Sequence, residues 1–206
     1  KWACATANEE LGKLPREKAK ILKVAAEEIA NGKHIHQFPV DVFQTGSGTS
    51  SNMNANEVIA NRASQITDKP IGSKDPLHPN DDVNMGQSSN DIIPSTLHLS
   101  VAITIKENLV PALKHLAITL QKKSEAFHDI VKIGRTHLMD ATPLTLGQEF
   151  SGYAAQLNKS VKRAEKSLDL LSELAIGGTA VGTGINCHPD FPRKVCKILS
   201  EKTKIN

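Results

Sequence analysis

Residues 134–149 bring one histidine together with several hydroxyl groups, in the sequence GRTHLMDATPLTLGQE. Histidine is the side chain that titrates closest to neutral pH, which makes His137 a candidate general acid or base. Thr142 and Pro143 are expected to open a helix, because proline is accepted in a first turn whose amides lack partners within the helix. His137 would then lie near the positive end of the helix dipole, where an anion is stabilised. The pattern predicts proton transfer beside a bound anion; an ordinary hydrogen-bonded histidine is the alternative.

Two further segments offer hydrogen-bond donors to an anion. Ser88, Ser89, Asn90 and Asp91 are all good helix N-caps, so free amides at a helix start are expected to face a ligand there. The loop 46–52 is rich in glycine and hydroxyl groups but lacks the Lys-Ser/Thr pair of a P-loop. This loop is expected either to hold a small anion or to form a plain structural turn.

The sequence predicts neither a nucleotide site nor a metal site. The glycine-rich segment 177–184 follows an expected helix, whereas a dinucleotide-binding loop follows a strand and opens a helix. The 8 histidines include no HExxH motif and the 3 cysteines form no CxxC pair. Residues 78–84, HPNDDVN, are expected to form a dense polar turn.

The elements that must position these residues are predicted to be helices. With only 5 Phe, 1 Trp and 1 Tyr, the core must be built mainly from aliphatic side chains, which favours helices packed on helices. Helices are predicted from Pro15 to about residue 31, over 56–66, over 89–127 with a kink or split at Pro111, and from Pro143 to about 175. Segment 38–45 is expected to be extended, and segment 67–87 irregular.

The predicted fold class is all-α, with an N-terminal helical domain over residues 1–86 and a central long-helix bundle over 87–206. Apolar residues keep to one face of each long helix, so each helix must bury a stripe. The chain offers too few partners for those stripes, and the bundle is expected to be completed by oligomerisation or by further sequence. The start at Lys1, which runs straight into helical sequence, indicates an incomplete piece.

Charge and hydropathy restrict the classes of partner. The formal net charge of +3 is small for 206 residues, so nothing indicates binding to nucleic acid. No apolar run is as long as the roughly 18 residues of a membrane span, and no leader sequence opens the chain. The 3 cysteines are odd in number and argue against a disulfide framework, so a reducing cytosol or organelle matrix is expected.

Taken together, five segments resemble class II fumarate hydratase, within the fumarase/aspartase superfamily. They are GSGTSSNMNANEVIANRA (46–63), HPNDDVN (78–84), GQSSNDIIP (86–94), GRTHLMDATPLTLGQEFSGY (134–153) and GGTAVGTGIN (177–186). The resemblance extends over essentially all 206 residues. It implies a helical homotetramer without metal or other cofactor, which reversibly hydrates fumarate to L-malate in the tricarboxylic acid cycle at active sites shared between subunits. The expected location is the cytoplasm, or the mitochondrial matrix in a eukaryote.

The resemblance also implies roles for individual residues. His137 matches the active-site histidine assigned to proton transfer. Positions that match substrate-binding residues are Ser47, Gly48, Thr49, Ser88, Ser89, Asn90 and Thr136. A second anion site outside the catalytic pocket matches His78, Pro79, Asn80 and Asp81.

Two alternatives to fumarate hydration stay open. Aspartases share much of this sequence, but they typically carry Ser-Thr in place of Ser88-Ser89 and Gln in place of His137. The other alternative is a non-catalytic helical fragment that only assembles. The family's mobile loop, with the signature GSSxMPxKxNP, does not occur in the sequence, so the 206 residues alone are expected to be inactive. Met139 departs from the polar residue that many relatives carry there.

Overall fold

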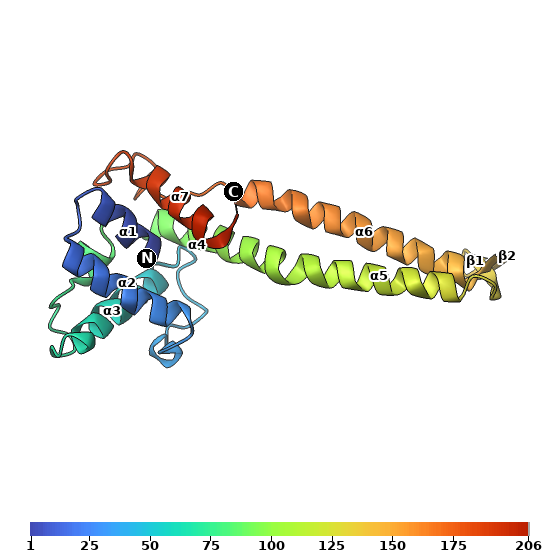
Figure 1. The fold of residues 1–206 in the computed structure, drawn as a ribbon, viewed down its shortest axis with the longest axis horizontal. Coiled ribbons are helices and arrows are strands. Elements are labelled where there is room, and N and C mark those ends of the chain that lie inside the picture. Colours follow the sequence, from blue (N-terminus) through green and yellow to red (C-terminus); the bar gives the residue numbers. More distant parts are fainter. Residues whose placement is uncertain (206) are drawn as a thin grey trace. The chain divides into compact units, whose positions relative to one another are not determined.

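The computed structural model describes residues 1–205, most of which are helical. Internal contacts divide the chain into two compact units: residues 1–98 together with the chain from Leu174 onward, and residues 99–173. Figure 1 shows the order of the elements along the chain. The predicted division into domains 1–86 and 87–206 differs from these units and stays a prediction.

The first unit is built from helices of short and medium length, joined by loops. Its elements are α1 (Trp2–Glu10), α2 (Arg16–Ala30), a 3-10 turn (Ile35–Gln37), α3 (Thr49–Ile66), a π turn (Pro79–Val83), the first part of α4 (Ser89–Thr104) and α7 (Phe191–Thr203).

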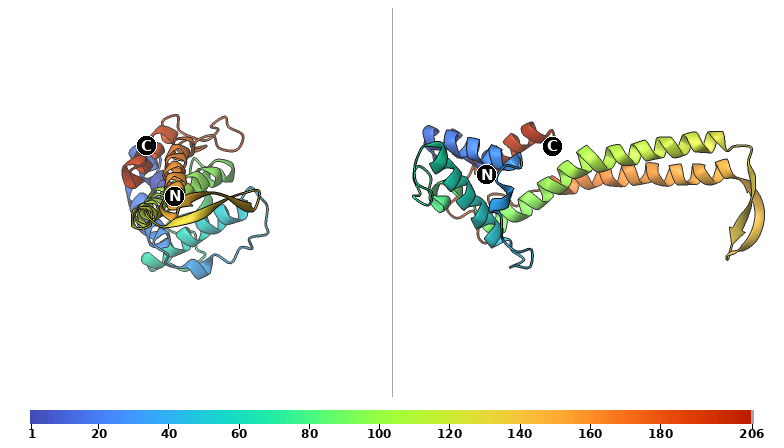
Figure 2. Two further views of the ribbon diagram at one scale, coloured as in Figure 1. Left: turned by 90° about the vertical axis from the view of Figure 1, so that its right-hand side faces the viewer. Right: turned by 90° about the horizontal axis from the view of Figure 1, so that it is seen from below.

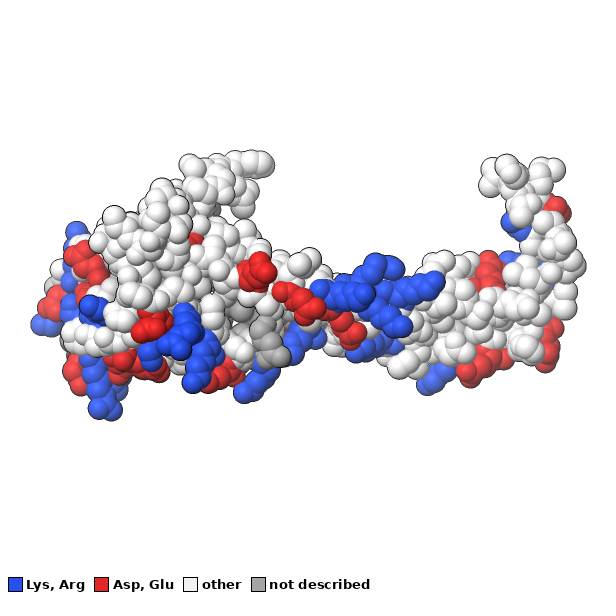
Figure 3. All heavy atoms as spheres, turned by 90° about the horizontal axis from the view of Figure 1, so that it is seen from above, with Lys and Arg blue, Asp and Glu red and all other residues white. Residues whose placement is uncertain are grey.

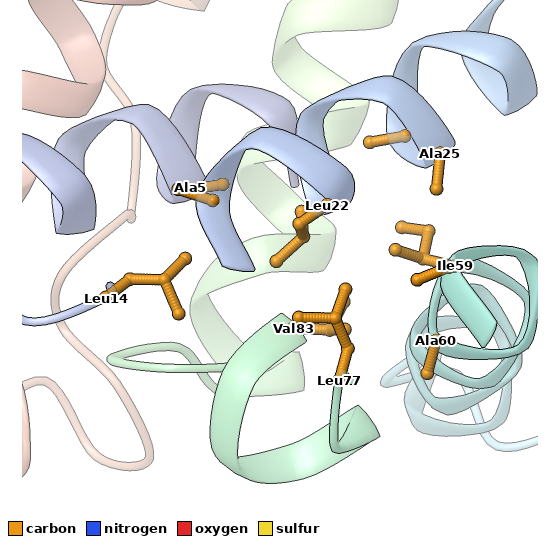
Figure 4. Packing of buried hydrophobic residues seen from close by; sticks show 11 residues of the cluster. Ala5, Leu14, Leu22, Ala25, Ile59, Ala60, Leu77 and Val83 are labelled. Atoms are coloured by element: carbon orange, nitrogen blue, oxygen red, sulfur yellow. The ribbon is translucent and has the colours of Figure 1, made fainter. Parts of the chain in front are cut away.

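The amphipathic pattern of α2 produces the larger core of this unit. Ala19, Leu22, Ala25 and Ala26 recur at helical spacing and are buried. The three alanines among them have small side chains, which allow α1 and α3 to approach α2 closely. Figure 4 shows Leu22 with side chains from α1, α3 and the segment that leads into the π turn. Burial of a leucine of this kind is worth about 1.5 to 3 kcal/mol.

A second core cluster joins the two ends of the described chain. Phe191 and Val195 of α7 are buried against Ala3, Cys4 and other residues of the first unit. The first unit is therefore closed by a helix that follows the whole second unit in the sequence.

The second unit is an antiparallel helix pair with a hairpin at one end. It contains the end of α4, a π segment (Ile105–Leu109), α5 (Val110–Ala126), β1 (Val131–Thr136), β2 (Met139–Thr145) and α6 (Leu146–Leu171). Figures 1 and 2 show α5 and α6 side by side along their length. The buried apolar residues between them include Ala117, Ala154 and Val161.

Where α6 begins, its backbone lies directly against the end of α5. A Cβ atom added to Gly147 would stand 2.5 Å from the carbonyl oxygen of Ser124, so only glycine fits there. Ser124 Oγ donates a hydrogen bond of 2.7 Å to the Gly147 carbonyl oxygen. These contacts fix the point at which the hairpin leaves the helix pair.

The prediction of a helical fold is confirmed, and the predicted break near Pro111 is present. The π segment Ile105–Leu109 precedes this proline, which has no N–H to donate to the carbonyl one turn earlier. The predicted start of α3 at residue 56 is wrong, because the helix begins at Thr49. Segment 38–45 contains bends and no strand.

The predicted helix start at Thr142 and Pro143 is also wrong. Both residues lie in β2, where Pro143 pairs with Ile133 of β1. A two-stranded sheet consists of edge strands alone, and an edge strand tolerates a residue that cannot donate a hydrogen bond. The helix begins at Leu146 instead, after Thr145 and Gln148 have formed a capping box.

Acidic and basic side chains lie in neighbouring groups on the face that Figure 3 draws, with broad areas of other residues between them. One pair links the two long helices: Lys114 Nζ lies 2.8 Å from Glu165 Oε1. None of the described helices combines the length and the apolar character that crossing a bilayer requires.

Candidate functional site

The hydroxyl loop and the start of α4 lie in direct contact in the first unit. Gly48 has a φ of +66°, and a Cβ atom added to it would stand 3.0 Å from the side chain of Ile93. A larger residue would be strained and would push the loop away from α4. Glycine at position 48 thus keeps the exposed hydroxyls of Ser47 and Thr49, which are 3.0 Å apart, close to the first turn of α4.

Two side chains accept hydrogen bonds from backbone N–H groups at the first turn of α4. Ser88 Oγ accepts a hydrogen bond of 3.2 Å from the backbone N–H of Asn90, and Asp91 Oδ1 accepts one of 2.9 Å from the backbone N–H of Ser88. This reciprocal pair is the arrangement of a capping box. The backbone and hydroxyl of Ser88 are thereby held in one orientation.

Asp91 also ties the glycine-rich segment to this helix start. Its side chain is 1% exposed, and Oδ2 accepts hydrogen bonds from the backbone N–H groups of Gly177 (3.0 Å) and Thr179 (2.9 Å). Asn90 Nδ2 donates to the carbonyl oxygen of Ala180 at 2.7 Å. A buried carboxylate that accepts three backbone N–H groups is fully satisfied, so the segment is anchored rather than loose.

Ser89 is held by Asn52, which lies within the quoted segments but was not predicted as a site residue. Its hydroxyl oxygen lies 3.1 Å from Asn52 Nδ2, and the same amide nitrogen lies 3.3 Å from Asn84 Oδ1. Asn52 is buried on α3, three residues after Thr49. The available signal was the helical spacing, which turns Asn52 to the same side of α3 as Thr49.

His137 lies at the tip of the β-hairpin in the second unit, where it is exposed. The prediction that it lies beside a helix start is wrong, because the strand β2 separates it from α6. His137 and Leu138 form the turn with φ values of 49° and 62°, a conformation that glycine and asparagine adopt more readily. Such backbone strain in non-glycine residues is typical of functional turns.

The hairpin has a bulge that requires glycine and a base that is anchored by charge. A Cβ atom added to Gly134 would stand 2.6 Å from the carbonyl oxygen of Thr142. At the base, Lys132 forms an ion pair with Glu149 of α6, and Tyr153 donates a hydrogen bond of 2.8 Å to Glu149. Hydrogen bonds from Lys132 and then Tyr153 hold the pKa of Glu149 below its ordinary value. These contacts orient the strand that carries Thr136 into the turn.

The polar turn at residues 78–84 forms a separate arrangement in the first unit. His78 Nδ1 accepts hydrogen bonds from the backbone N–H groups of Asn80 (3.3 Å) and Asp81 (3.1 Å), and Pro79 is buried. Asp82 accepts from the backbone N–H of His78 at 2.8 Å and pairs with Lys18 at 2.8 Å. The imidazole thus already caps the amides that the predicted second anion site would use.

The predicted site residues are divided between the two units. In the first unit Gly48 packs against Ile93 and Asn52 hydrogen-bonds to Ser89, so the starts of α3 and α4 are neighbours. These two starts carry Ser47, Gly48, Thr49, Ser88, Ser89 and Asn90. Thr136 and His137 belong to the second unit. Among residues 1–205, no three His, Cys, Asp or Glu side chains cluster as a metal site would require.

The chain thus consists of two helical units, with hydroxyl groups at helix starts in the first and a histidine on a hairpin in the second. A family model described as lyase matches residues 1–206, and the chain belongs to that family. Its relatives include proteins named class II fumarate hydratase from Photorhabdus laumondii, 54% identical over 98% of this chain, and from Halobacterium salinarum, 53% identical over 100%. The chain spans 44% and 43% of the lengths of these two relatives.

Solved structures agree with this assignment. A class II fumarase from Schistosoma mansoni superposes with a TM-score of 0.94 at 43% identity, over 98% of this chain and 42% of that one. A fumarate lyase:delta crystallin from Brucella melitensis gives 0.93 at 44% identity, over 99% and 44%. A carboxymuconate cycloisomerase from Acinetobacter, at 18% identity and a TM-score of 0.73, shares the fold.

Proposed function

We propose that the protein carrying this sequence reversibly hydrates fumarate to L-malate. The observation that supports the proposal most is the contact between two hydroxyl-bearing helix starts, Ser47 to Thr49 and Ser88 to Asn90, in a lyase whose relatives are named fumarate hydratase. Amides and hydroxyls at helix starts suit the carboxylate groups of a small dicarboxylate.

The chemistry of dehydration explains why such donors are needed. Removal of the proton from the carbon beside one malate carboxylate leaves an electron pair that spreads onto that carboxylate. The hydroxyl group on the neighbouring carbon then leaves and, with a proton, becomes water. Donors aimed at the doubly charged carboxylate stabilise this intermediate, and one such donor is worth about a hundredfold to a thousandfold in rate.

His137 is proposed to move a proton in this reaction through a bound water, and Thr136 to contribute a donor beside it. Their exposed position on a hairpin tip suits a group that serves a site completed by other subunits. We therefore propose a homotetramer with shared active sites, located in the cytoplasm or, in a eukaryote, in the mitochondrial matrix. The turn His78 to Asp81 is proposed as a second anion site; its amides become available once the imidazole turns away.

The proposal is tested by following the loss of fumarate absorbance in the ultraviolet, with the protein expressed at its natural length. Loss of absorbance with formation of L-malate supports it. The aspartase alternative is tested in the same assay with ammonium salt added, and formation of aspartate would overturn the choice of water as the second substrate. Residues 1–206 alone, assayed in parallel, are expected to be inactive.

A further inference from the structure

A chain of polar side chains runs through the first unit to the hydroxyl of Ser89. Lys1 Nζ donates to Asn84 Oδ1 at 2.8 Å and to Gln87 Oε1 at 2.9 Å. Asn84 Oδ1 also faces Asn52 Nδ2 at 3.3 Å, and Asn52 Nδ2 lies 3.1 Å from Ser89 Oγ. In this series of hydrogen bonds an ammonium group can only donate and a carbonyl oxygen can only accept. The donor and the acceptor of each hydrogen bond can therefore be assigned.

The orientation of Asn84 is fixed by two partners of opposite character. An ammonium group only donates, so the Asn84 atom that faces Lys1 is the oxygen. The other end of the amide lies 3.2 Å from the carbonyl oxygen of Gln87, which only accepts, so that end is the nitrogen. Both partners assign the same orientation.

The orientation of Asn52 follows from that of Asn84. The Asn52 atom that faces the oxygen of Asn84 must be a donor, which makes it Nδ2. The same nitrogen faces Ser89 Oγ, so the serine hydroxyl accepts this hydrogen bond. A hydroxyl carries one proton, and that proton must therefore point away from Asn52.

The other atom of the Asn52 amide, Oδ1, meets no donor in this arrangement. Asn52 is 3% exposed, and its Oδ1 has no hydrogen-bond partner in the part of the chain that the structure describes. A buried acceptor without a partner costs stability, so its presence in a native fold calls for an explanation. Oδ1 of Asn54 and Oδ1 of Asn56 share this property, so the argument for Asn52 depends on the contacts of its Nδ2.

We propose that Asn52 is a positioning residue that orients the hydroxyl of Ser89 as a donor toward a substrate carboxylate. The inference rests on the proposed function, because Ser89 must bind the substrate for the orientation to matter. Asn52 itself touches no reacting atom. It acts by occupying a lone pair of Ser89 Oγ, which leaves the hydroxyl proton free for the anion.

The test is a double-mutant cycle in the full-length protein, with kcat/KM for fumarate as the readout. Ser89→Ala is expected to lower kcat/KM by about ten- to a hundredfold, the range for a hydrogen bond to a charged group. Asn52→Ala is expected to lower it by about three- to tenfold in the presence of Ser89. In the Ser89→Ala background, Asn52→Ala should change kcat/KM by less than about twofold. A purely structural asparagine would instead give independent, multiplicative losses, and that result overturns the inference.

A second variant reverses the polarity at nearly constant shape. In Asn52→Asp the carboxylate accepts from Ser89 and turns the hydroxyl proton away from the substrate, so kcat/KM should fall further than in Asn52→Ala. The matched control is Asn54→Asp on the same helix, where the amide binds the carbonyl oxygen of Gln37 and not a site residue. Equal losses in the two Asp variants, or no loss at Asn52, would contradict the proposal. Thermal unfolding of each variant separates a loss of folding from a loss of positioning.

Failure of the proposed function gives a different pattern. If the wild-type protein does not turn over fumarate but binds it, the same cycle is measured as the dissociation constant for fumarate by calorimetry, with the same expected coupling. If the wild-type protein neither turns over nor binds fumarate, both the function and the role of Asn52 are overturned.

Discussion

At the scale of single residues, some side chains of the candidate site are fixed by hydrogen bonds and others are exposed to solvent. Ser88 is held by hydrogen bonds to Asp91 and Asn90, whereas His137 is exposed on a turn. The sequence predicted the type of these residues, because hydroxyls, amides and a histidine are what anion binding and proton transfer require. It did not predict Asn52, since its role depends on Asn84 and Ser89, which come from other segments.

The role of His137 is tested by His137→Asn in the full-length protein. Turnover should fall by about two to four powers of ten, the usual contribution of a general acid or base. Assembly should be unchanged, because the side chain is exposed on the hairpin tip. His115→Asn, at another exposed histidine of the same unit, should leave turnover unchanged. Turnover near the wild-type value in the His137 variant would refute the assigned role.

At the scale of elements, the hairpin is the feature that the sequence least reveals. Residues 142–145 contain signals for a helix start, but the true N-cap is Thr145, and the segment before it pairs with β1. Proline is common in the first turn of a helix, but here the pairing of β2 with β1 determines the structure of this segment. The long helices were predictable because their apolar stripes persist over many turns.

The hairpin bulge gives a prediction at this scale. Gly134→Ala would place a methyl group 2.6 Å from the Thr142 carbonyl oxygen, so the strands must separate and the turn that carries His137 must shift. Turnover is expected to fall by about a hundredfold, as displacement of a catalytic group by about 1 Å can cause. Gly152→Ala on α6 is the control, because a Cβ there has open space. Near-normal turnover in the Gly134 variant would show that the hairpin geometry is not needed.

The ion pair between α2 and α3 gives a pH prediction. Arg62 donates to both oxygens of Glu28, at 2.6 and 3.2 Å, and this hydrogen bonding lowers the pKa of Glu28 from 4.5 to about 2. A lowered folded-state pKa stabilises the fold above pH 4.5, and the contribution is lost as pH falls from 4.5 toward 2. The melting temperature of wild type should therefore drop more steeply over this range than that of Arg62→Gln. Parallel curves for the two proteins would exclude the pair as the cause.

At the scale of the whole molecule, the two-helix unit cannot bury its own apolar surface. Leu116, Ile118 and Leu170 are 47%, 58% and 74% exposed on α5 and α6. A pair of helices covers only the faces between them, which is why the sequence predicted partners for the bundle. The number and arrangement of those partners depend on contacts between several chains. One sequence therefore predicts that partners exist but does not predict how they are arranged.

Ile118→Glu tests whether α5 lies in such an interface. A charge placed in an apolar interface costs several kcal/mol, so the full-length protein should dissociate to smaller species at micromolar concentration. Light scattering after size exclusion gives the mass. Ile118→Leu, which keeps the side chain apolar at the same position, is the matched control and should keep the wild-type mass. An unchanged mass for Ile118→Glu would remove this face of α5 from the interface.

The first unit is assembled from both ends of the described chain, with residues 99–173 inserted between them. This discontinuity has a consequence for biosynthesis. On the ribosome, α1 emerges long before α7, so the helices of the first unit must wait for their last partner while the insertion is made. The α5–α6 pair needs only neighbouring segments and can form as soon as it leaves the exit tunnel. Nascent chains halted when residue 173 has just left the exit tunnel should accordingly be cleaved in the N-terminal helices, which still lack α7, and less readily within residues 99–173.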